Sequence, residues 1–480
     1  MSDLSRPPRQ ARIALSRRAF LAGAAVLAAN AAPRRAGAAQ PTGPQPPGSW
    51  RPWFLTSGDG ARPLPPASPS ADELAEVRSL QAKRTTGVAM AVEKWSTAPA
   101  ILPWTNLALD LIEMHQPSPV RAARALALLH TALADTTIAV WDARAAYPRP
   151  APAALDAAIV PLGDPVAANT AFPSEHAAIA ATAAPLLAYL FPDEPAAGLD
   201  ALANDAAMSR LWAGTNVRSD IAAGQAIGRA VADRAIARGK ADGSAKSWDG
   251  QSRPTAPGVW QPTPPAYIQQ PTDPLAGRWT PWVLASGSQF RAPTPPAYRS
   301  PAWQAEVIAV QEAVRRRTPK QTAAAPWWAG GAGTTTPAGL WTVIARGLIV
   351  RDGFDLPHAA RALALTTAAM ADASICCWDA KFAYWTERPI TADPTLAVLF
   401  PTPPFPSYTS GHATLSAAAA TVLGHLFPND QDGLAAQAME AAASRIWAGI
   451  HFPIDSDVGM AGGREVGRLV VARAVGDGAE

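Results

Sequence analysis

Residues 358–381 read HAARALALTTAAMADASICCWDAK, and residues 121–144 read RAARALALLHTALADTTIAVWDAR. Both stretches are rich in alanine and leucine, which favour helix, and similar alanine-rich amphipathic segments dominate the chain. The alternation of valine and isoleucine with polar residues that is typical of strands is scarce. The sequence therefore predicts an all-α protein.

The two stretches belong to an internal duplication. An earlier match, Trp53 with Ser57-Gly58 against Trp282 with Ser286-Gly287, indicates that the repeat begins before the helices. The matched segments follow in the same order in both halves, so this is one repeat and not scattered similarity. We therefore expect two tandem helical bundles. The later matches are Trp141–Arg144 with Trp378–Lys381, Phe172–His176 with Phe405–His412, Ser209–Gly214 with Ser444–Gly449, and Asp220 with Asp455.

Prolines mark the connections between the helical parts. The chain has 49 prolines, and many of them cluster in Pro41–Pro69 and Pro254–Pro301. The second stretch joins the two halves and is expected to be a long, ordered or semi-ordered segment that wraps around the protein. The expected division is a leader at 1–38, a first bundle at 39–240, a proline-rich connector at 241–300 with the second repeat starting near 279, and a second bundle at 301–480.

Three short segments of the second copy contain side chains suited to a tetrahedral oxyanion. A phosphate or vanadate group has several negative charges, so removing it from water requires convergent cations and hydrogen-bond donors. Lysine supplies a point charge, arginines supply planar forks for paired oxygens, and glycine lets the backbone N–H approach. The order and spacing of the segments predict one oxyanion site with two histidines beside it. The segments are Lys381-x6-Arg388-Pro389, Ser410-Gly411-His412 and Ser444-Arg445-x5-His451-x3-Asp455.

The local sequence predicts how these residues are presented. Lys381 and Arg388 lie two helical turns apart and share a face if the helix persists, while Pro389 places Arg388 at the helix end. Residues 410–412 follow a loop and precede the small-residue run Ala413–Leu426, a predicted helix. They are therefore expected at a helix N-terminus, where free N–H groups favour anions.

The third segment predicts a histidine held by a carboxylate. Gly449 is expected to end the helix that contains Arg445, so that His451 falls in the following loop. Asp455 is expected near the start of the next helix, where it holds the His451 ring through its second nitrogen. Three other reactive side chains are expected to be structural only: His425, Cys376 and Cys377.

The first copy lacks two of these features. Asn216 stands where the second histidine is expected, and an amide cannot serve as an imidazole ligand or nucleophile. Glu175 stands where the glycine is expected and adds negative charge beside an anion. The segment Arg144-x4-Arg149 is also two residues shorter than its counterpart. The first half is therefore predicted to be a scaffold that packs against the second site.

The motifs at 381–455 resemble those of the vanadium haloperoxidase and PAP2-type acid phosphatase superfamily. Residues 279–475 are similar to its soluble, chloroperoxidase-like branch, which folds as two four-helix bundles and binds vanadate as a trigonal bipyramid. The resemblance implies that His451 coordinates vanadium, while His412 bonds the other apical oxygen and manages protons. Peroxide then oxidises a halide, and the hypohalous product halogenates an organic acceptor. The equatorial oxygens are expected on Lys381, Arg388, Ser410, Gly411 and Arg445.

Two aromatic residues favour the haloperoxidase branch over the phosphatases. Trp378 and Phe405 match aromatic residues near the halide position of that branch, although aromatics beside a site are often packing residues alone. Thr409 departs from the proline that usually precedes the Ser-Gly-His segment. The segments between the motifs are short, and their lengths are closer to those of the acid phosphatases.

A phosphatase is the rival hypothesis, because the same set of cations and hydrogen-bond donors around the anion, here called the cage, serves phosphoryl transfer. His451 would then attack phosphorus to form a phosphohistidine, and His412 would protonate the leaving group. A third hypothesis is an exported oxyanion-binding scaffold without activity. The intact second copy, in contrast to the altered first copy, argues against this third reading. The sequence does not assign an acid partner to His412.

The N-terminal residues predict export. Residues 16–21 read SRRAFL and precede a short apolar run, Ala22–Ala32, with small residues up to Ala38. This pattern is typical of a twin-arginine signal, and its apolar run is too short to span a bilayer. We expect the protein to work in the periplasm or outside the cell, on small-molecule substrates and without a membrane partner.

The leader also explains the basic charge. Through Ala38 it contains seven arginines and Asp3, a net of +6, while the whole chain is +3, which leaves 3 − 6 = −3 for the remainder. No basic patch with interleaved aromatics appears, so nucleic-acid binding has little support. The adjacent cysteines predict no disulfide framework.

Overall fold

The computed structural model describes residues 45–96, 99–163, 170–251, 253–331 and 333–480. In these residues the chain consists of α-helices, short 3-10 turns and two isolated β-bridges, Arg149 with Thr170 and Val259 with Thr386, and it contains no strand. The predicted all-α fold class is confirmed. None of the helices in this described part has the length and apolar character needed to cross a membrane. The predicted twin-arginine signal lies outside the described residues and stays a prediction.

The elements of the first half run from residue 47 to residue 241. Four helices, α5 with α7, α8 and α9, form its bundle, and α4 packs beside them. They are η3 (Pro47–Ser49), η4 (Gly58–Ala61), α2 (Ala71–Ala82), α3 (Thr86–Trp95), α4 (Leu102–His115), α5 (Pro119–Ala146), α6 (Pro152–Leu155), α7 (Glu175–Leu190), α8 (Ala196–Ala213) and α9 (Arg218–Ala241).

The second half repeats this order after a long connector that contains only a short 3-10 turn. Its bundle is formed by α13 with α15, α16 and α17, and α12 takes the place of α4. The elements are η5 (Ala276–Arg278), α10 (Pro301–Arg316), α11 (Pro319–Ala329), α12 (Thr336–Arg351), α13 (Leu356–Tyr384), α14 (Pro389–Ala392), α15 (Gly411–Leu426), η6 (Pro428–Asp430), α16 (Gln431–Trp447) and α17 (Pro453–Val475). Two tandem bundles from one duplication, joined by proline-rich segments, are therefore confirmed.

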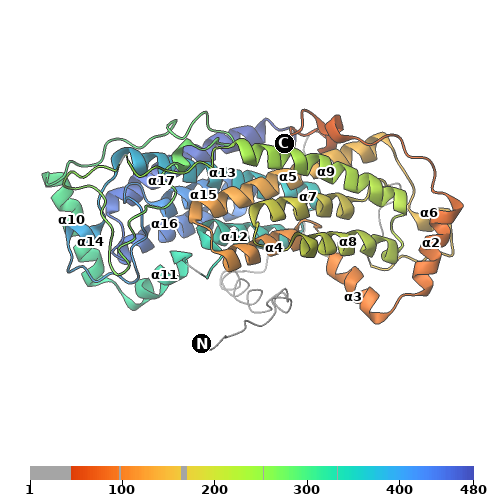
Figure 1. Ribbon diagram of the computed structural model, residues 1–480, viewed down its shortest axis with the longest axis horizontal. Helices are drawn as coiled ribbons and strands as arrows, with labels where there is room; N and C mark the ends of the chain where they lie inside the picture. The colour runs from red at the N-terminus through yellow and green to blue at the C-terminus, as the bar shows by residue number, and fades with distance from the viewer. Residues whose placement is uncertain (1–44, 97–98, 164–169, 252, 332) are drawn as a thin grey trace, which may run out of the picture.

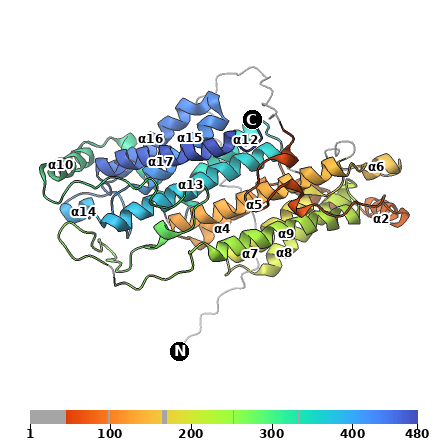
Figure 2. The same ribbon diagram turned by 90° about the horizontal axis from the view of Figure 1, so that it is seen from above.

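The two long helices α5 and α13 pack against each other in the middle of the molecule. Figure 2 shows them side by side, with the remaining helices of each half on either side. Figure 1 shows the consequence for the ends of the molecule: α10 and α14 lie at one end, and α2 and α6 lie at the other. Because α14 and α6 are equivalent in the repeat, the two copies present their equivalent ends in opposite directions.

A buried carboxylate holds the loop that precedes the helices in each copy. Asp372 of α13 accepts hydrogen bonds from the backbone N–H groups of Trp282, Val283 and Leu284, at 2.7, 2.8 and 2.9 Å. Asp135 of α5 does the same for residues 53–55. Burial raises the pKa of both carboxyl groups to about 6, against the lowering effect of these hydrogen bonds. These two residues therefore act as anchors for a loop in each copy.

The last helix of each half reaches the loop of the other half. The Arg238 guanidinium of α9 lies 3.6 Å from the ring centre of Trp282, and that of Arg473 in α17 lies 3.7 Å from the ring centre of Trp53. The two tryptophan rings meet edge to face, with centres 5.9 Å apart. Each half therefore completes the packing of its partner, and the first half is part of the structure that supports the second.

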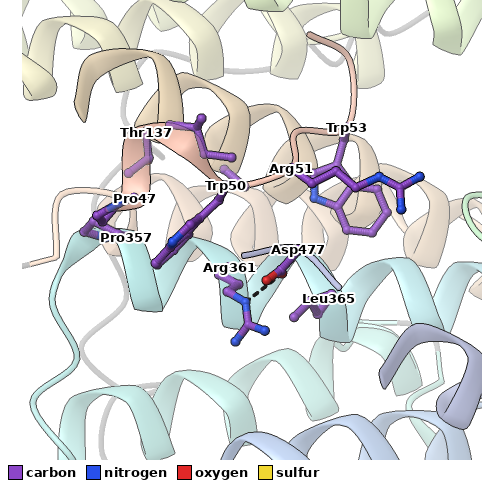
Figure 3. Close-up of a pocket in the computed structure, with 11 residues that line it drawn as sticks. Pro47, Trp50, Arg51, Trp53, Thr137, Pro357, Arg361, Leu365 and Asp477 are labelled. Atoms are coloured by element: carbon purple, nitrogen blue, oxygen red, sulfur yellow. Dashed lines mark hydrogen bonds and ion pairs between the residues drawn. The ribbon is translucent and has the colours of Figure 1, made fainter. Parts of the chain in front are cut away.

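A pocket lies on this boundary, away from the predicted oxyanion site. Figure 3 shows Trp50 beside Pro357, with Arg361 bonded to Asp477 at 2.8 Å. Its lining comes from both halves and includes none of the residues predicted to hold an anion. The pocket is therefore a feature of the junction between the copies.

The connector between the halves lies against the loops of the second copy. Trp260 is fully buried, and its backbone N–H donates to the Trp385 carbonyl at 2.6 Å. Glu387 N–H donates to the Gly258 carbonyl at 3.0 Å, and Thr272 N–H donates to the Pro404 carbonyl at 2.9 Å. These bonds join the connector to the chain segments on both sides of the predicted site.

Glycines allow the helices that begin at the site to pack closely. A Cβ atom on Gly463 of α17 would lie 2.1 Å from the Thr414 carbonyl oxygen of α15, and one on Gly228 of α9 would lie 2.3 Å from the Ala178 carbonyl oxygen of α7. Neither distance is physically allowed for a side chain. The backbones are thus in direct contact in both copies, which brings the N-terminal ends of α15 and α17 together.

We expect Asp372→Ala to lower the free energy of unfolding by about 3 kcal/mol or more, because three backbone N–H groups lose their buried acceptor. Chemical denaturation measures this change. Glu465→Ala is the control, since its carboxylate pairs with Arg468 on the exposed surface, and a change within about 0.5 kcal/mol is expected there. Equal midpoints for the two variants would contradict the anchoring role of Asp372.

Candidate active site

The predicted residues of the second copy meet at the end of the bundle where α10 and α14 lie (Figure 1). They come from the last turns of α13 and α16, the first turns of α15 and α17, and the loops between them. The buried members are each at most 2% exposed, and Gly411 and His412 are half-buried. The buried members are Lys381, Arg388, Ser410, Arg445, His451 and Asp455.

Lys381 lies in the last turn of α13 and is fully buried. Its Nζ donates to the backbone carbonyls of Pro406 and Ser407 at 2.7 and 2.9 Å. Burial, together with the charge of Arg388, lowers its pKa to about 7. The ammonium group therefore faces the loop before α15 with its charge only partly compensated.

Arg388 does not share a helix with Lys381, because α13 ends at Tyr384 and Trp385 adopts a left-handed conformation with φ of 53°. The expectation that one helix presents both side chains is therefore wrong. Pro389 does have the predicted effect, since Arg388 is extended and precedes the short α14. Its guanidinium donates to the Phe405 and Ile450 carbonyls at 2.8 and 2.7 Å.

His451 is held as a neutral imidazole in one defined tautomer. Its Nδ1 lies 2.9 Å from Asp455 Oδ2, and an Arg388 N–H lies 3.1 Å from its Nε2. Because the carboxylate accepts and the guanidinium donates, the ring proton is on Nδ1 and the lone pair is on Nε2. Burial, and after it the charge of Arg388, lowers the pKa of His451 well below its ordinary value. The ring therefore presents a lone pair among cations.

Asp455 joins the loops of the site. It lies in the first turn of α17, where its carboxylate accepts from the Phe452 N–H at 3.0 Å and from the Ser407 hydroxyl. Its backbone carbonyl accepts from the Ser410 N–H at 2.9 Å. Ser407 was missed by the sequence reasoning, because its partner is 48 residues away. No local pattern indicates such a contact.

Ser410, Gly411 and His412 begin α15, as the sequence predicts. His412 Nε2 lies 2.9 Å from the Trp328 carbonyl and 3.1 Å from the Ala329 carbonyl, so its proton is on Nε2. These carbonyls end α11, a helix that the sequence reasoning did not connect with the site. In the described part of the chain, the ring is thus oriented by backbone oxygens and not by an acidic side chain.

Arg445 completes the cluster from the last turn of α16. Its Nε donates to Ser444 Oγ at 3.0 Å, and another N–H donates to the Ala325 carbonyl of α11. Burial lowers its pKa to about 9. As predicted, α16 ends just before Gly449, which has φ of 78°.

The cluster has more positive charge than its own carboxylate compensates. The charges of Arg388, Lys381 and Arg445 all contribute to the lowered pKa of His451, so the three cations act on one point. Asp455 is the carboxylate that faces them, and burial raises its pKa to about 6. Buried charges of one sign repel one another unless a counter-ion joins them. A tetrahedral oxyanion such as phosphate or vanadate has the charge and the acceptor oxygens that this donor set fits.

Trp378 and Phe405 form one wall of the cluster. Their ring centres are 5.1 Å apart, and Lys381 Nζ lies 5.0 Å from the Phe405 ring centre. A Cβ atom on Gly411 would lie 3.6 Å from the Trp378 ring. The two aromatic residues therefore lie beside residues that are predicted to hold an anion, and their assignment to a halide stays a prediction.

Both halves match a known family. The model of the PAP2 superfamily matches residues 123–237 and again residues 361–475. This chain belongs to the PAP2 superfamily. The two matched regions contain the equivalent clusters of the two copies, so the duplication is a duplication of the PAP2 domain.

Solved structures are similar to most of this chain. A bacterial vanadium-dependent iodoperoxidase is 26% identical, with a TM-score of 0.64, and the match covers 78% of this chain and 95% of that one. Two structures of bacterial vanadium-dependent chloroperoxidase are each 15% identical to this chain. The apo form has a TM-score of 0.56, and the match covers 76% of this chain and 96% of that one. The holo form has a TM-score of 0.53, and the match covers 81% of this chain and 96% of that one. No curated protein sequence matched this chain.

The first PAP2 copy has the same backbone hydrogen bond between its helices, but other side chains replace those of the second site. Ser174 N–H donates to the Asp220 carbonyl at 3.0 Å, as its counterpart does in the second copy. Asn216, in place of the histidine, donates to the Ala171 carbonyl at 2.6 Å. Glu175, in place of the glycine, is 2.7 Å from the Arg144 guanidinium. The predicted replacements therefore lie at the equivalent place in the fold.

We expect Asp455→Ala to weaken orthovanadate binding by about 10- to 100-fold, because His451 loses the acceptor that orients its ring. Equilibrium dialysis of the full chain measures the affinity. The matched control is Asp220→Ala, which removes the equivalent carboxylate of the first PAP2 copy and is expected to leave this affinity unchanged. A similar loss in both variants would mean that the effect is a general one on the fold.

Sulfate binding to the second PAP2 copy is expected to weaken as the pH rises above 7. The free Lys381 has a pKa of about 7, and a bound anion raises it, so binding takes up a proton in this range. Sulfate does not titrate there, and the dissociation constant is expected to rise about tenfold per unit between about pH 7.5 and 8.5. Calorimetry at several pH values tests this. Lys381→Arg, which keeps its charge, is expected to remove the slope, and a flat profile for the unaltered protein would refute the role of Lys381.

Proposed function

We propose that this protein is a vanadium-dependent haloperoxidase that oxidises halide with hydrogen peroxide in its second PAP2 copy. The observation that carries the proposal is the neutral His451 imidazole, whose Nε2 lone pair lies among buried cations while Asp455 holds Nδ1. A single imidazole lone pair surrounded by cationic donors suits an oxyanion of a metal that needs one protein ligand. The similarity to a bacterial vanadium-dependent iodoperoxidase supports the choice of vanadate.

The proposed roles follow from where each group lies. His451 Nε2 would be the ligand to the metal, and Asp455 would keep the ring in the correct tautomer. The oxygens of the anion are held by charge and by the helix N-terminus. Binding requires the side chains to exchange their bonds to backbone carbonyls for bonds to the anion. The residues that would hold the oxygens are Lys381, Arg388, Ser410, Gly411 and Arg445.

Bound vanadate would supply a Lewis-acidic centre that activates hydrogen peroxide toward halide. Overall, the halide gives two electrons to peroxide, and with one proton the products are hypohalous acid and water. His412 is proposed to handle the proton at its Nδ1, since Nε2 is bonded to the carbonyls that end α11. Burial and the charge of Arg445 keep its pKa well below the ordinary value, so the resting ring is neutral and readily gives up a proton that it has accepted.

The halide is proposed to approach along the wall formed by Trp378 and Phe405. Both rings face Lys381, and the Phe405 ring centre also lies 4.9 Å from the Arg388 guanidinium carbon. A weakly hydrated anion is compatible with an apolar wall beside cations. The hypohalous product would then react with an organic acceptor. The proposed partners are therefore small molecules, and the proposed place of action is outside the cytoplasm, as residues 1–38 predict.

Phosphoester hydrolysis is the second candidate, because the same groups serve it. His451 Nε2 would attack phosphorus, the P–O bond to the leaving group would break, and His412 would give that group a proton. Water would then hydrolyse the phosphohistidine. The match to the PAP2 superfamily is compatible with both reactions, so activity assays must separate the two.

We expect protein lacking residues 1–38, incubated with orthovanadate, to brominate or iodinate a dye in the presence of hydrogen peroxide and the halide. The rate is expected to depend on vanadate and to fall when phosphate competes for the cage. His451→Ala is expected to reduce the rate to background, because the metal loses its protein ligand. Dye absorbance measures the rate.

His425→Ala is the matched control, since this partly exposed histidine pairs with Glu480 at 2.8 Å, away from the cage. It is expected to keep full activity. Hydrolysis of a phosphoester that vanadate inhibits, without any halide oxidation, would replace the proposal by the phosphatase. If His451→Ala changed no activity of either kind, both would be wrong.

A further inference from the structure

The first PAP2 copy contains a glutamate where the second has the glycine that faces the anion. Glu175 is the first residue of α7, and Gly411 is the first residue of α15. The Glu175 carboxylate accepts from the Arg144 guanidinium at 2.7 Å. Arg144 corresponds to Lys381 in the repeat. The carboxylate is therefore bonded to the side chain that takes the place of the lysine of the second cage.

The rest of the cage is retained around this carboxylate. Arg210, the counterpart of Arg445, is 6% exposed and has the same bond from its Nε to the neighbouring serine, at 2.9 Å. Arg149 is also buried and bonds to Asp220 at 2.9 Å. His176 follows Glu175 as His412 follows Gly411. Three cations and a histidine are thus retained in a copy that lacks the second histidine. Arg149 and Arg210 are buried, and Arg144 and His176 are half-buried.

Several donors of this copy are left without a partner. Among the described residues, the Ser174 hydroxyl and the Nε atoms of Arg144 and Arg149 are buried and have no hydrogen-bond partner. Ser174 is 1% exposed, and its hydroxyl does not cap α7, whereas Ser410 caps α15. Buried donors without partners are costly, so an additional acceptor among them would be favoured. A carboxylate has two oxygens, and a tetrahedral oxyanion has four.

The electrostatics agree with this geometry. Burial alone would raise the pKa of Glu175, but Arg144, His176 and Arg210 together lower it below the ordinary value. The carboxylate is therefore charged at neutral pH and compensates the cations around it. Gly411 has no equivalent group, so the second cage has an uncompensated charge.

We propose that the first PAP2 copy is a second site for a tetrahedral oxyanion, closed by the carboxylate of Glu175, which takes the place of the ligand. The site would bind phosphate or vanadate once this side chain is removed. It would not take part in catalysis, because Asn216 replaces the histidine and its amide is bonded to the Ala171 carbonyl. The proposal concerns binding in the first copy and does not depend on the reaction of the second.

The reciprocal exchange is sterically allowed. A Cβ atom on Gly411 would meet only the Trp378 ring, at the ordinary contact distance of 3.6 Å. Gly411 is also absent from the positions with positive φ, so a glutamate can adopt its backbone conformation. Gly411→Glu is therefore expected to close the second cage as Glu175 closes the first.

The test counts inorganic phosphate bound to the full chain by equilibrium dialysis. The unaltered protein is expected to bind one phosphate, in the second copy, and Glu175→Gly is expected to bind two. Arg144→Ala in the Glu175→Gly chain is expected to return the count to one. Unchanged binding in a folded Glu175→Gly chain would overturn the proposal. If the unaltered chain bound none and Glu175→Gly bound one, this proposal would stand while the proposed function of the second copy would fail.

Two further comparisons keep the test decisive if Glu175→Gly does not fold. Glu175→Gln keeps the shape and removes the charge, so it is expected to gain phosphate binding at the first copy, with an affinity weaker than that of the second. Gly411→Glu is expected to lose the second phosphate site, whereas Gly411→Gln is expected to retain part of its affinity. Equal affinity for Gly411→Glu and Gly411→Gln, or no gain in Glu175→Gln, would contradict closure by charge.

Discussion

The second copy is organised around the burial of two guanidinium groups and one ammonium group at the same point. Such a cluster persists only where carbonyls, a carboxylate or a bound anion compensate it. Lys381 and Arg388 use the carbonyls of the loop before α15, and Arg445 uses a carbonyl of α11. The loop before α15 is therefore shaped by the charges it faces. Because Asp455 bonds both to this loop and to His451, the same interactions that hold the cations also orient the imidazole.

The two copies share one arrangement of helices and cations but differ in what compensates the positive charge. In both copies, the N–H of the serine before the helix donates to the carbonyl of the aspartate in the next helix but one, and glycines let those helices touch. The cations are kept in both. What differs is the source of compensating charge, which is the chain's own Glu175 in the first copy and, as proposed, an external oxyanion in the second.

The first copy contributes to the second through packing. Arg238 of α9 lies over Trp282, whose backbone N–H is bonded to Asp372 in the middle of α13. The last turn of α13 carries Lys381. The altered first copy is thus retained as part of the core, consistent with the prediction of a scaffold. This arrangement explains why a half without the second histidine keeps its buried helices and its interface.

Features that depend on neighbours along the chain could be predicted from the sequence alone. These are the helical class, the repeat, the start of α15 at Gly411, the end of α16 before Gly449, and the contact of Asp455 with a histidine four residues away. Contacts between distant segments became evident only in the folded structure. Ser407 with Asp455, the α11 carbonyls with His412, and Glu175 with Arg144 join residues 48, 84 and 31 positions apart. Such contacts depend on how helices pack, and no local preference of either partner encodes them. The end of α13 at Tyr384 also depends on tertiary contacts, because Trp385 packs against residues distant in sequence, such as Trp260.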